Sequence, residues 1–400
     1  MSNTKSKLIL KNKLNRNNME SIQQPIIQQP IIQLQQCKIC EELFSNETIL
    51  DTHIKQSHRK HTFIEVCAGA GGLSKGLIKA GFIPLLLNDN NKDCCKTLEK
   101  NHRDLIDNNT DGTSLKIICD SLTKIDLTQY IDRVDLLTGG IPCQSWSQSG
   151  ARQGLEDPRG DLMLKFADLI ETIKPKMFMI ENVKGLLSHA EGESLKKIII
   201  NLNKNNLYDI VYKVLNAMNY GVPQKRERVF IIGMLKTENI KYEYPKPNDR
   251  IITVGEALRD VPISEGAVYS DSKKSYFALI PEGGCWVNLP EDKQREYLMA
   301  SFESGGGKRG ILHRLSNSKP SLTLLCTPSQ KQTERCHPTE IRPLRVREYA
   351  HIQSFPDDYE FIGSMASKYK QIGNAVTVEL ARQVGLSLIK ALYKPIPNST

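Results

Sequence analysis

The chain has 400 residues, of which 39% are hydrophobic and 25% are charged, close to ordinary globular usage. This length allows roughly two or three domains. No apolar run reaches the roughly 18 residues that cross a bilayer, and the basic opening lacks the apolar stretch of a secretion signal. We therefore expect a soluble intracellular protein with no membrane partner. The formal net charge of +9 favours a polyanionic partner, because neutralised phosphates release counterions, although many basic proteins bind no nucleic acid.

Ten cysteines in a chain without a secretion signal do not indicate a disulfide scaffold, so we expect thiols, metal ligands or a nucleophile. Residues 1–36 are basic and rich in Gln, and Pro25 and Pro30 block regular helix and strand pairing. We predict a disordered tail there.

Residues 37–61 carry a metal-ligand pattern. Two cysteines with two residues between them precede two histidines with four between them, a spacing that supplies tetrahedral ligands for Zn²⁺. These ligands are Cys37, Cys40, His53 and His58. With Phe44 and Leu50 at core positions, the segment resembles the two-Cys, two-His zinc-finger family, which implies a small ββα finger with structural zinc. The alternative is two free thiols and two surface histidines. A lone finger can contact about three base pairs, bind protein or only fold.

From Thr62 onward, short apolar runs alternate with helical stretches. This alternation predicts an α/β fold with a mostly parallel, doubly wound sheet. The expected strands are 62–67, 83–88, 115–119, 134–140, 176–182 and 228–233, and the expected helices are 72–81, 92–102, 160–173, 346–353 and 374–392. Residues from about 240 to 340 lose the alternation and are rich in Pro, Gly and Ser, so we predict a smaller irregular domain there.

A glycine-rich turn follows the first expected strand, between Phe63 and Gly72, and opens into a helix. Glycines permit close backbone approach, and a helix N-terminus offers free N–H groups. The turn is Gly-x-Gly-Gly and not the dinucleotide fingerprint, so nicotinamide is not favoured. Asp89 and Asp120 end the next two strands, where acids can bind ribose and adenine. Each aspartate alone is more often a helix cap or a turn residue.

Further chemistry-bearing residues follow later strands. Cys143 lies after Pro142 in a polar, glycine-flanked loop, which favours a nucleophile over a small buried side chain. Glu181 and Asn182 end an apolar strand, where a charge is costly unless it is paired or used. Arg226 and Arg228 stand two apart and so on one side of a strand, and the alternative for them is a solvated charge run.

These segments together resemble the DNA (cytosine-5) methyltransferase family, from about residue 62 to about residue 392. The sequences FIEVCAGAGGLSKGL, PCQ followed by GLEDPRGDLM, ENV, QKRERVFIIG, RPLRVREYAHIQSFP and YKQIGNAVTVELA stand in the order of that family. The resemblance implies a Rossmann-like methyltransferase fold. It also implies transfer of a methyl group from S-adenosyl-L-methionine to carbon 5 of a cytosine that is flipped out of duplex DNA.

The resemblance assigns roles to six catalytic residues, which are Cys143, Glu181, Arg228, Arg226, Asn182 and Gln144. The Cys143 thiolate would add to carbon 6 of the base, which makes carbon 5 nucleophilic. Glu181 would bind ring nitrogen 3 and the exocyclic amine. Arg228, together with Arg226, would bind the carbonyl oxygen and a nearby phosphate. Asn182 and Gln144 would support this arrangement.

The resemblance also implies a cofactor site at the glycine turn. Its residues would be Phe63, Cys67, Gly69, Gly71, Gly72, Leu73, Asp89, Asp120, Ser121, Pro142, Leu162, Asn374 and Val376. Asp89 would bind the ribose and Asp120 the adenine, while Asn374 and Val376 would close the pocket. Asp89 stands where the family more often has Glu, which shortens the reach, and Cys67 stands where many relatives have Phe, which removes an aromatic contact.

The resemblance divides the chain after the finger into three parts. Residues 62–245 would form the catalytic domain, 246–340 a target-recognition domain, and 341–400 a C-terminal part that returns to the catalytic domain. Candidates for DNA contact in the recognition region are Lys308, Arg309, Arg314 and Lys331, although surface charge explains any one of them equally well. We expect a monomer that acts on duplex DNA, with a cognate restriction endonuclease as a further partner.

Two other functions fit parts of this pattern. One is an RNA cytosine-5 methyltransferase, but the branch that methylates transfer RNA has a very short recognition region and a Cys-Phe-Thr tripeptide that this chain lacks. The other is an inactive zinc-finger regulator that only binds DNA, but the nucleophile and its partners are all present. The location would be the nucleus in a eukaryotic or viral setting and the cytoplasm otherwise.

Overall fold

The computed structural model describes residues 35–36, 43–44, 61–107, 114–142, 160–303, 310–331 and 333–393. Seven of the described strands form one sheet in the order β5-β4-β3-β6-β7-β10-β8. Their bounds are β3 (Thr62–Val66), β4 (Ile83–Asp89), β5 (Lys116–Cys119), β6 (Leu136–Gly139), β7 (Met177–Val183), β8 (Tyr208–Asn216) and β10 (Glu227–Leu235). Strands β5, β4, β3, β6 and β7 are parallel, and β10 runs antiparallel between β7 and β8. The predicted α/β fold with a mostly parallel sheet is therefore confirmed.

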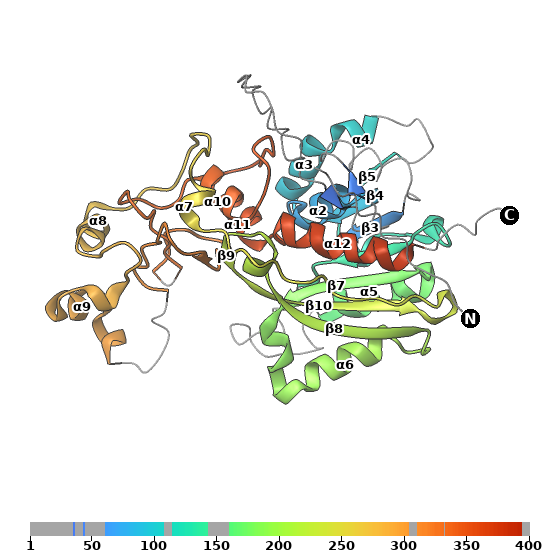
Figure 1. The fold of residues 1–400 in the computed structure, drawn as a ribbon. Coiled ribbons are helices and arrows are strands. Elements are labelled where there is room, and N and C mark those ends of the chain that lie inside the picture. Colours follow the sequence, from blue (N-terminus) through green and yellow to red (C-terminus); the bar gives the residue numbers. More distant parts are fainter. Residues whose placement is uncertain are drawn as a thin grey trace, which may run out of the picture.

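The central strands are apolar because helices cover both of their faces. One core lies between the sheet and α2 (Gly72–Ala80), α3 (Lys92–Asn101), α4 (Arg103–Asp107) and α12 (Val378–Leu392). A second core lies between the opposite face and α5 (Gly160–Ile173) and α6 (Glu193–Leu202). Figure 1 shows the sheet between these two helical layers. Strand β8 was not predicted, because it is the edge strand and its middle residues are largely exposed.

Small residues allow α2 and α12 to pack closely. A Cβ atom added to Gly76 would lie 2.4 Å from the Cβ of Ala381, and one added to Gly385 would lie 2.8 Å from the Cβ of Ala80. Both distances are too short for real side chains. The C-terminal helix is thus fixed against the helix that follows the glycine turn.

The C-terminal part forms α10 (Val346–Ile352), α11 (Met365–Asn374) and α12. The predicted helix 374–392 begins too early, because α11 ends at Asn374 and α12 starts at Val378. Ala375 and Thr377 are extended between them, and two β-branched residues in this linker disfavour helix. The break brings the backbone of residues 374–376 to the start of α2.

The irregular region after β10 contains α7 (Val254–Ala257), α8 (Asp271–Ala278) and α9 (Glu291–Leu298), which lie to the left in Figure 1. It has an apolar cluster of its own and a buried carboxylate, Glu334, which binds Lys273 Nζ at 2.6 Å and the Leu312 amide at 2.6 Å. The short strand β11 (Ser321–Leu322) leaves this region and pairs in parallel with β9 (Gln224–Lys225).

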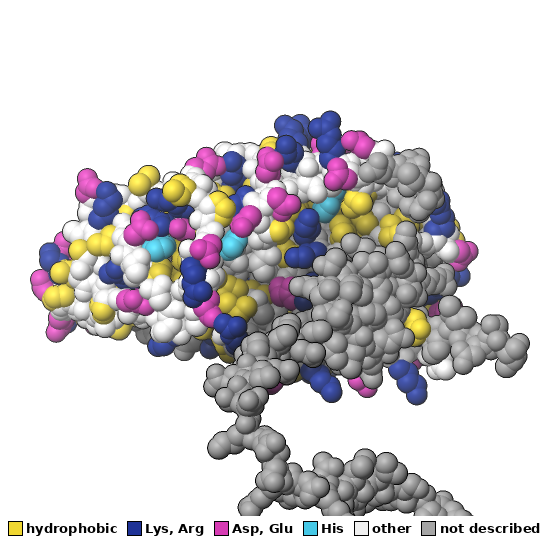
Figure 2. Space-filling model, turned by 45° about the horizontal axis from the view of Figure 1, so that its top comes forward, with side chains coloured by type: hydrophobic (Ala, Val, Ile, Leu, Met, Phe, Trp, Pro, Cys, Tyr) yellow, Lys and Arg dark blue, Asp and Glu magenta, His cyan; other side chains and the backbone are white. Residues whose placement is uncertain are grey.

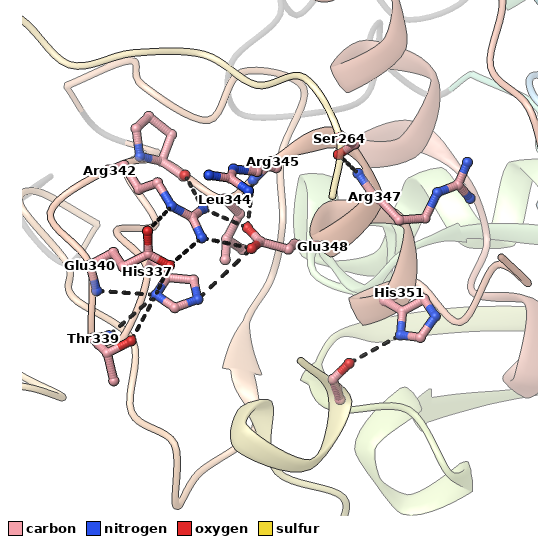
Figure 3. Close-up of polar contacts among 12 residues, drawn as sticks. Ser264, His337, Thr339, Glu340, Arg342, Leu344, Arg345, Arg347, Glu348 and His351 are labelled. Atoms are coloured by element: carbon pink, nitrogen blue, oxygen red, sulfur yellow. Dashed lines mark hydrogen bonds and ion pairs between the residues drawn. The ribbon is translucent and has the colours of Figure 1, made fainter. Parts of the chain in front are cut away.

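A polar cluster at the start of α10 fixes the chain between residues 337 and 348 (Figure 3). Arg342 binds both oxygens of Glu348 at 2.7 and 2.8 Å, and the backbone N–H of Arg345 donates to the same carboxylate. His337 Nδ1 accepts hydrogen bonds from the backbone N–H groups of Thr339 and Glu340. Because a bidentate Arg–carboxylate pair fixes geometry as well as charge, this cluster anchors the irregular region to α10.

Near the N-terminus, β1 (Gln35–Gln36) pairs antiparallel with β2 (Leu43–Phe44). The predicted zinc ligands Cys37, Cys40, His53 and His58 lie outside the described residues. Within the part of the chain that the structure describes, no group of three or more His, Cys, Asp or Glu side chains could hold a metal ion. No helix in the same part is both long and apolar enough to cross a membrane.

Candidate active site

The glycine turn between β3 and α2 has the backbone conformation that its sequence predicts. Gly69 and Gly71 have φ values of 56° and 80°, and Cys67 adopts 53° between them and β3. The carboxylate of Asp89, at the end of β4, accepts a hydrogen bond from the backbone N–H of Gly69 at 2.8 Å. The turn is therefore held by the aspartate that the sequence assigned to the ribose.

Each glycine of the turn faces a different environment. A Cβ atom added to Gly69 would meet nothing within 4 Å, whereas one added to Gly72 would lie 2.2 Å from the carbonyl oxygen of Val376. The space beside Gly71 is filled by the hydroxyl group of Tyr359. This hydroxyl group donates a hydrogen bond to the carbonyl oxygen of Ala70 at 2.6 Å. The turn thus presents open space at Gly69, beside the start of α2.

Two of the predicted cofactor residues are core residues. The side chains of Phe63 and Leu73 are 0% and 1% exposed, and both belong to the core between the sheet and α2 and α12. Both side chains pack into the core and away from the turn, and a role of these residues in the cofactor site stays a prediction. Cys67 lies at the turn and is partly buried, and burial raises the pKa of its thiol to about 12.

The second predicted acid, Asp120, is exposed just beyond β5 and accepts the backbone N–H of Ser121 at 2.7 Å. The buried side chain of Asn88 ties the two strand ends together, because its amide donates to the carbonyl oxygens of Ile118 and Asp120. Asp89, Asp120 and Ser121 therefore lie at the neighbouring carboxyl ends of β4 and β5.

The loop after β6 approaches the end of β7. A Cβ atom on Gly140 would lie 3.9 Å from Oε2 of Glu181 and 3.8 Å from the carbonyl oxygen of Cys67. Asn182 Nδ2 donates to the carbonyl oxygen of Ile141 at 3.1 Å. Pro142 is exposed at the end of this described segment, and Cys143 and Gln144 lie outside the described residues.

Glu181 and Arg228 form an ion pair across β7 and β10. Arg228 Nε lies 3.0 Å from Oε1 of Glu181, and the two side chains are 14% and 11% exposed. That oxygen accepts no hydrogen bond within the described residues, so the contact leaves its acceptor capacity unused. A nearly buried carboxylate with unused acceptor capacity, beside Gly140 and the glycine turn, is suited to binding a polar ligand.

Arg226 has a different environment from Arg228. It is 2% exposed, and its guanidinium donates to the carbonyl oxygens of Leu324 at 3.2 Å and Ala375 at 3.0 Å. Burial lowers its pKa to about 9. These contacts join two distant segments through part of the guanidinium, and the contact between Arg226 and the target base stays a prediction.

The other predicted residues lie around this site. Leu162 packs, partly buried, against the second core, Val376 is buried, and Asn374 is exposed at the end of α11. Arg314 is partly buried and donates to the carbonyl oxygens of Ile280, Pro338 and Thr339. Lys331 is exposed but donates to the carbonyl oxygen of Tyr297. Lys308 and Arg309 lie outside the described residues.

Glu65 and Gln224 are two buried polar residues that were not predicted from the sequence. Glu65 lies in β3, is 1% exposed, hydrogen-bonds to Ser74 and has a pKa raised by burial to about 8. The sequence feature that could have identified Glu65 is an acidic residue inside an otherwise apolar strand. Gln224 is fully buried and links the Leu324 amide to the side chain of Gln353; no local pattern marks it.

On the one face drawn in Figure 2, the charged side chains of the described residues outline no single basic path. On the face shown in Figure 2, Lys and Arg side chains are interspersed with Asp and Glu. The polar side chains at the carboxyl ends of the strands therefore define the candidate site better than the charges on this face do.

A family model described as C-5 cytosine-specific DNA methylase matches residues 61–390. The chain is 45% identical over 354 residues to the Type II methyltransferase M.Eco47II of Escherichia coli, which covers 85% of this chain and 81% of that protein. It is 47% identical over 344 residues to the Type II methyltransferase M.PspPI of Psychrobacter sp. (strain TA137), with coverage of 84% and 80%. The methyltransferase EhMeth of Entamoeba histolytica shares the fold, with a TM-score of 0.59, 18% identity, and coverage of 84% of this chain and 100% of that chain.

Proposed function

The chain belongs to the family of C-5 cytosine-specific DNA methylases and is a DNA cytosine-5 methyltransferase; on this premise we propose that Cys143 is its nucleophile and that Glu181 and Arg228 bind the target cytosine. The ion pair between Glu181 and Arg228 carries the proposal. It keeps a carboxylate and a guanidinium together at a nearly buried position, close to the loop that leads to Cys143.

The residues of this site match the needs of the reaction. The Cys143 thiolate adds to carbon 6 of a flipped cytosine and gives carbon 5 enamine character. Glu181 binds ring nitrogen 3 and the exocyclic amine, and Arg228 binds the carbonyl oxygen as negative charge develops on the ring. After methyl transfer, loss of the carbon-5 proton and departure of the sulfur from carbon 6 restore the aromatic ring.

S-adenosylmethionine supplies the activated methyl group when it is bound, and the glycine turn fits such a ligand. Gly69 borders open space at a positive φ, and the first turn of α2 offers backbone N–H groups beside it. Asp89, Asp120 and Ser121 would bind the nucleoside part. Cys67 and Gly71 would form the floor of the pocket, and Asn374 and Val376 would close it.

Residues 246–340 would form the target-recognition domain, and 341–400 would return to the catalytic domain. The recognition region is supported by its own apolar cluster and by the buried ion pair between Glu334 and Lys273. Arg226 would act here as a positioning residue, because its guanidinium joins Leu324 of this region to Ala375. Duplex DNA is the proposed substrate, and a region of this length favours DNA over transfer RNA.

The remaining proposals concern partners and metal. A cognate restriction endonuclease is proposed because the curated relatives are Type II methyltransferases. A monomer inside the cell, where DNA is available, is the simplest arrangement. Cys37, Cys40, His53 and His58 would bind one zinc ion. Elemental analysis of the purified chain tests this, with about one zinc per chain expected and none in a Cys37→Ser, Cys40→Ser variant.

A covalent trap tests the nucleophile directly. Fluorine at carbon 5 cannot be removed as a proton is, so duplex DNA with 5-fluorocytosine at the target site should stay bonded to the enzyme in denaturing gels. Bisulfite sequencing of DNA from expressing cells would first give the target site. Cys143→Ala should form no adduct and methylate no DNA while it still binds duplex DNA. Methylation by this variant would disprove the assignment.

A further inference from the structure

Cys326 contacts one of the proposed cofactor residues from outside the catalytic sheet. Its Sγ donates a hydrogen bond to Oδ1 of Asn374 at 2.8 Å. Cys326 is partly buried, and it follows β11 within the proposed recognition region. Asn374 is exposed at the end of α11. The thiol therefore reaches an amide at the border of the proposed pocket.

The backbones on both sides of this contact are fixed. A Cβ atom on Gly373 would lie 2.2 Å from the carbonyl oxygen of Leu325 and 2.9 Å from the amide nitrogen of Cys326. The buried hydroxyl of Tyr349 donates to the same carbonyl of Leu325 at 2.8 Å. The two segments cannot shift past one another, so the thiol and the amide keep their relative position.

The direction of the hydrogen bond determines which end of the amide stays free. Burial raises the pKa of the Cys326 thiol, so the sulfur carries its proton at neutral pH and acts as the donor. The partner atom must then be the carbonyl oxygen of the Asn374 side chain. The Nδ2 group of the same amide then has two N–H bonds to donate.

We propose that Cys326 is a positioning residue for the methyl-transfer reaction, which fixes the amide of Asn374 so that Nδ2 donates to a hydrogen-bond acceptor of S-adenosylmethionine. This inference rests on the proposed role of Asn374 in the cofactor pocket. The segment of the recognition region that contains Cys326 would thereby contribute to cofactor binding.

Two substitutions separate the hydrogen bond from the volume of the side chain. Cys326→Val removes the donor and leaves the space filled by a slightly larger apolar side chain, and Cys326→Ser keeps a donor. The dissociation constant for S-adenosylhomocysteine, measured by calorimetry on the full chain, should rise about 3- to 10-fold in Cys326→Val and stay within about 2-fold in Cys326→Ser. The KM for S-adenosylmethionine should follow the same order while kcat changes little.

A double-mutant cycle with Asn374→Ala shows whether the thiol acts through the amide. Cys326→Val should weaken binding no further in the Asn374→Ala background. Full additivity, or unchanged affinity in Cys326→Val while Asn374→Ala binds weakly, would overturn the inference alone. Unchanged affinity in Asn374→Ala would instead remove the proposed role of Asn374, and the inference with it. Thermal denaturation of each variant without ligand controls for folding.

Discussion

Asn182 donates a hydrogen bond from Nδ2 to the carbonyl oxygen of Ile141 at 3.1 Å, and both residues are buried. The Oδ1 atom of the same amide accepts the backbone N–H of Val183 at 2.8 Å. The amide is thus held at both ends, and it ties the end of β7 to the segment that enters the loop of Cys143. Its orientation follows from these two contacts without any ligand.

Replacing Asn182 with Ala should lower kcat by roughly 10- to 100-fold, because a small displacement of a reacting group is costly. The affinity for duplex DNA should change much less, since Asn182 is buried. Steady-state transfer of a labelled methyl group measures kcat, and a gel-shift titration measures binding. A variant with kcat within 2-fold of the natural enzyme would show that the loop does not depend on this tie.

The contact between Gly72 and the carbonyl oxygen of Val376 gives a second prediction. A Cβ atom at Gly72 would lie 2.2 Å from that oxygen, so Gly72→Ala must displace residues 375–377 or the start of α2. We expect a loss of roughly 1–3 kcal/mol in the free energy of unfolding and weaker binding of S-adenosylhomocysteine.

Gly185→Ala is the matched control for this change. Gly185 has open space where the Cβ would lie and does not have a positive φ. Its substitution should change stability by less than about 0.5 kcal/mol. Urea unfolding of both variants makes the comparison, and equal stabilities would contradict the close approach at Gly72.

The sequence predicted the parallel part of the sheet well, because strands buried on both faces are apolar runs that stand out between helices. The edge strand β8 lacks that signal, since residues such as Tyr212 and Lys213 face solvent. The linker between α11 and α12 was also missed. There the packing of Val376 on Gly72, a contact between distant segments, decides the conformation.

Arg226 and Arg228 show why the sequence alone could not predict the environment of every residue in the site. Arg226 and Arg228 look equivalent in the sequence, yet only Arg228 meets Glu181. The acceptors of Arg226 lie 98 and 149 residues away along the chain, and no local pattern identifies backbone carbonyls at such a distance. The sequence predicted that the Asp89 side chain binds a ligand. The structure shows in addition that its carboxylate accepts a hydrogen bond from the backbone N–H of Gly69.

This difference predicts opposite effects of the same substitution. Arg228→Met should lower kcat by about 100-fold or more, because it removes a charge that would face the developing oxyanion and leaves the Glu181 carboxylate without its ion-pair partner. Arg226→Met should leave buried carbonyl oxygens without donors and cost roughly 2–4 kcal/mol in unfolding free energy. Urea unfolding and kcat measured on both variants separate the two roles. A stable Arg226→Met enzyme that fails to bind DNA would show instead that Arg226 contacts the substrate.

Glu65 gives a prediction for the dependence of stability on pH. Burial is the largest cause that raises its pKa from 4.5 to about 8, and nearby Asp89 and Glu181 add to the effect. In the unfolded chain this carboxyl loses its proton near pH 4.5, whereas the folded protein keeps the proton until about pH 8. The folded state therefore binds more protons between these values, and stability must fall as pH rises through this window.

Glu65→Gln should remove this slope, because the neutral amide keeps an oxygen for Ser74 and has no proton to lose. The natural protein should lose at most about 1.4 kcal/mol per pH unit relative to the variant between pH 5 and pH 8. Urea unfolding of both proteins at three pH values within this range measures the difference between their free energies of unfolding. The contributions of all other titrating groups cancel in this difference. Parallel curves for the two proteins would mean that Glu65 is ionised in the folded state, and hence that it has a partner or solvent beyond the contact with Ser74.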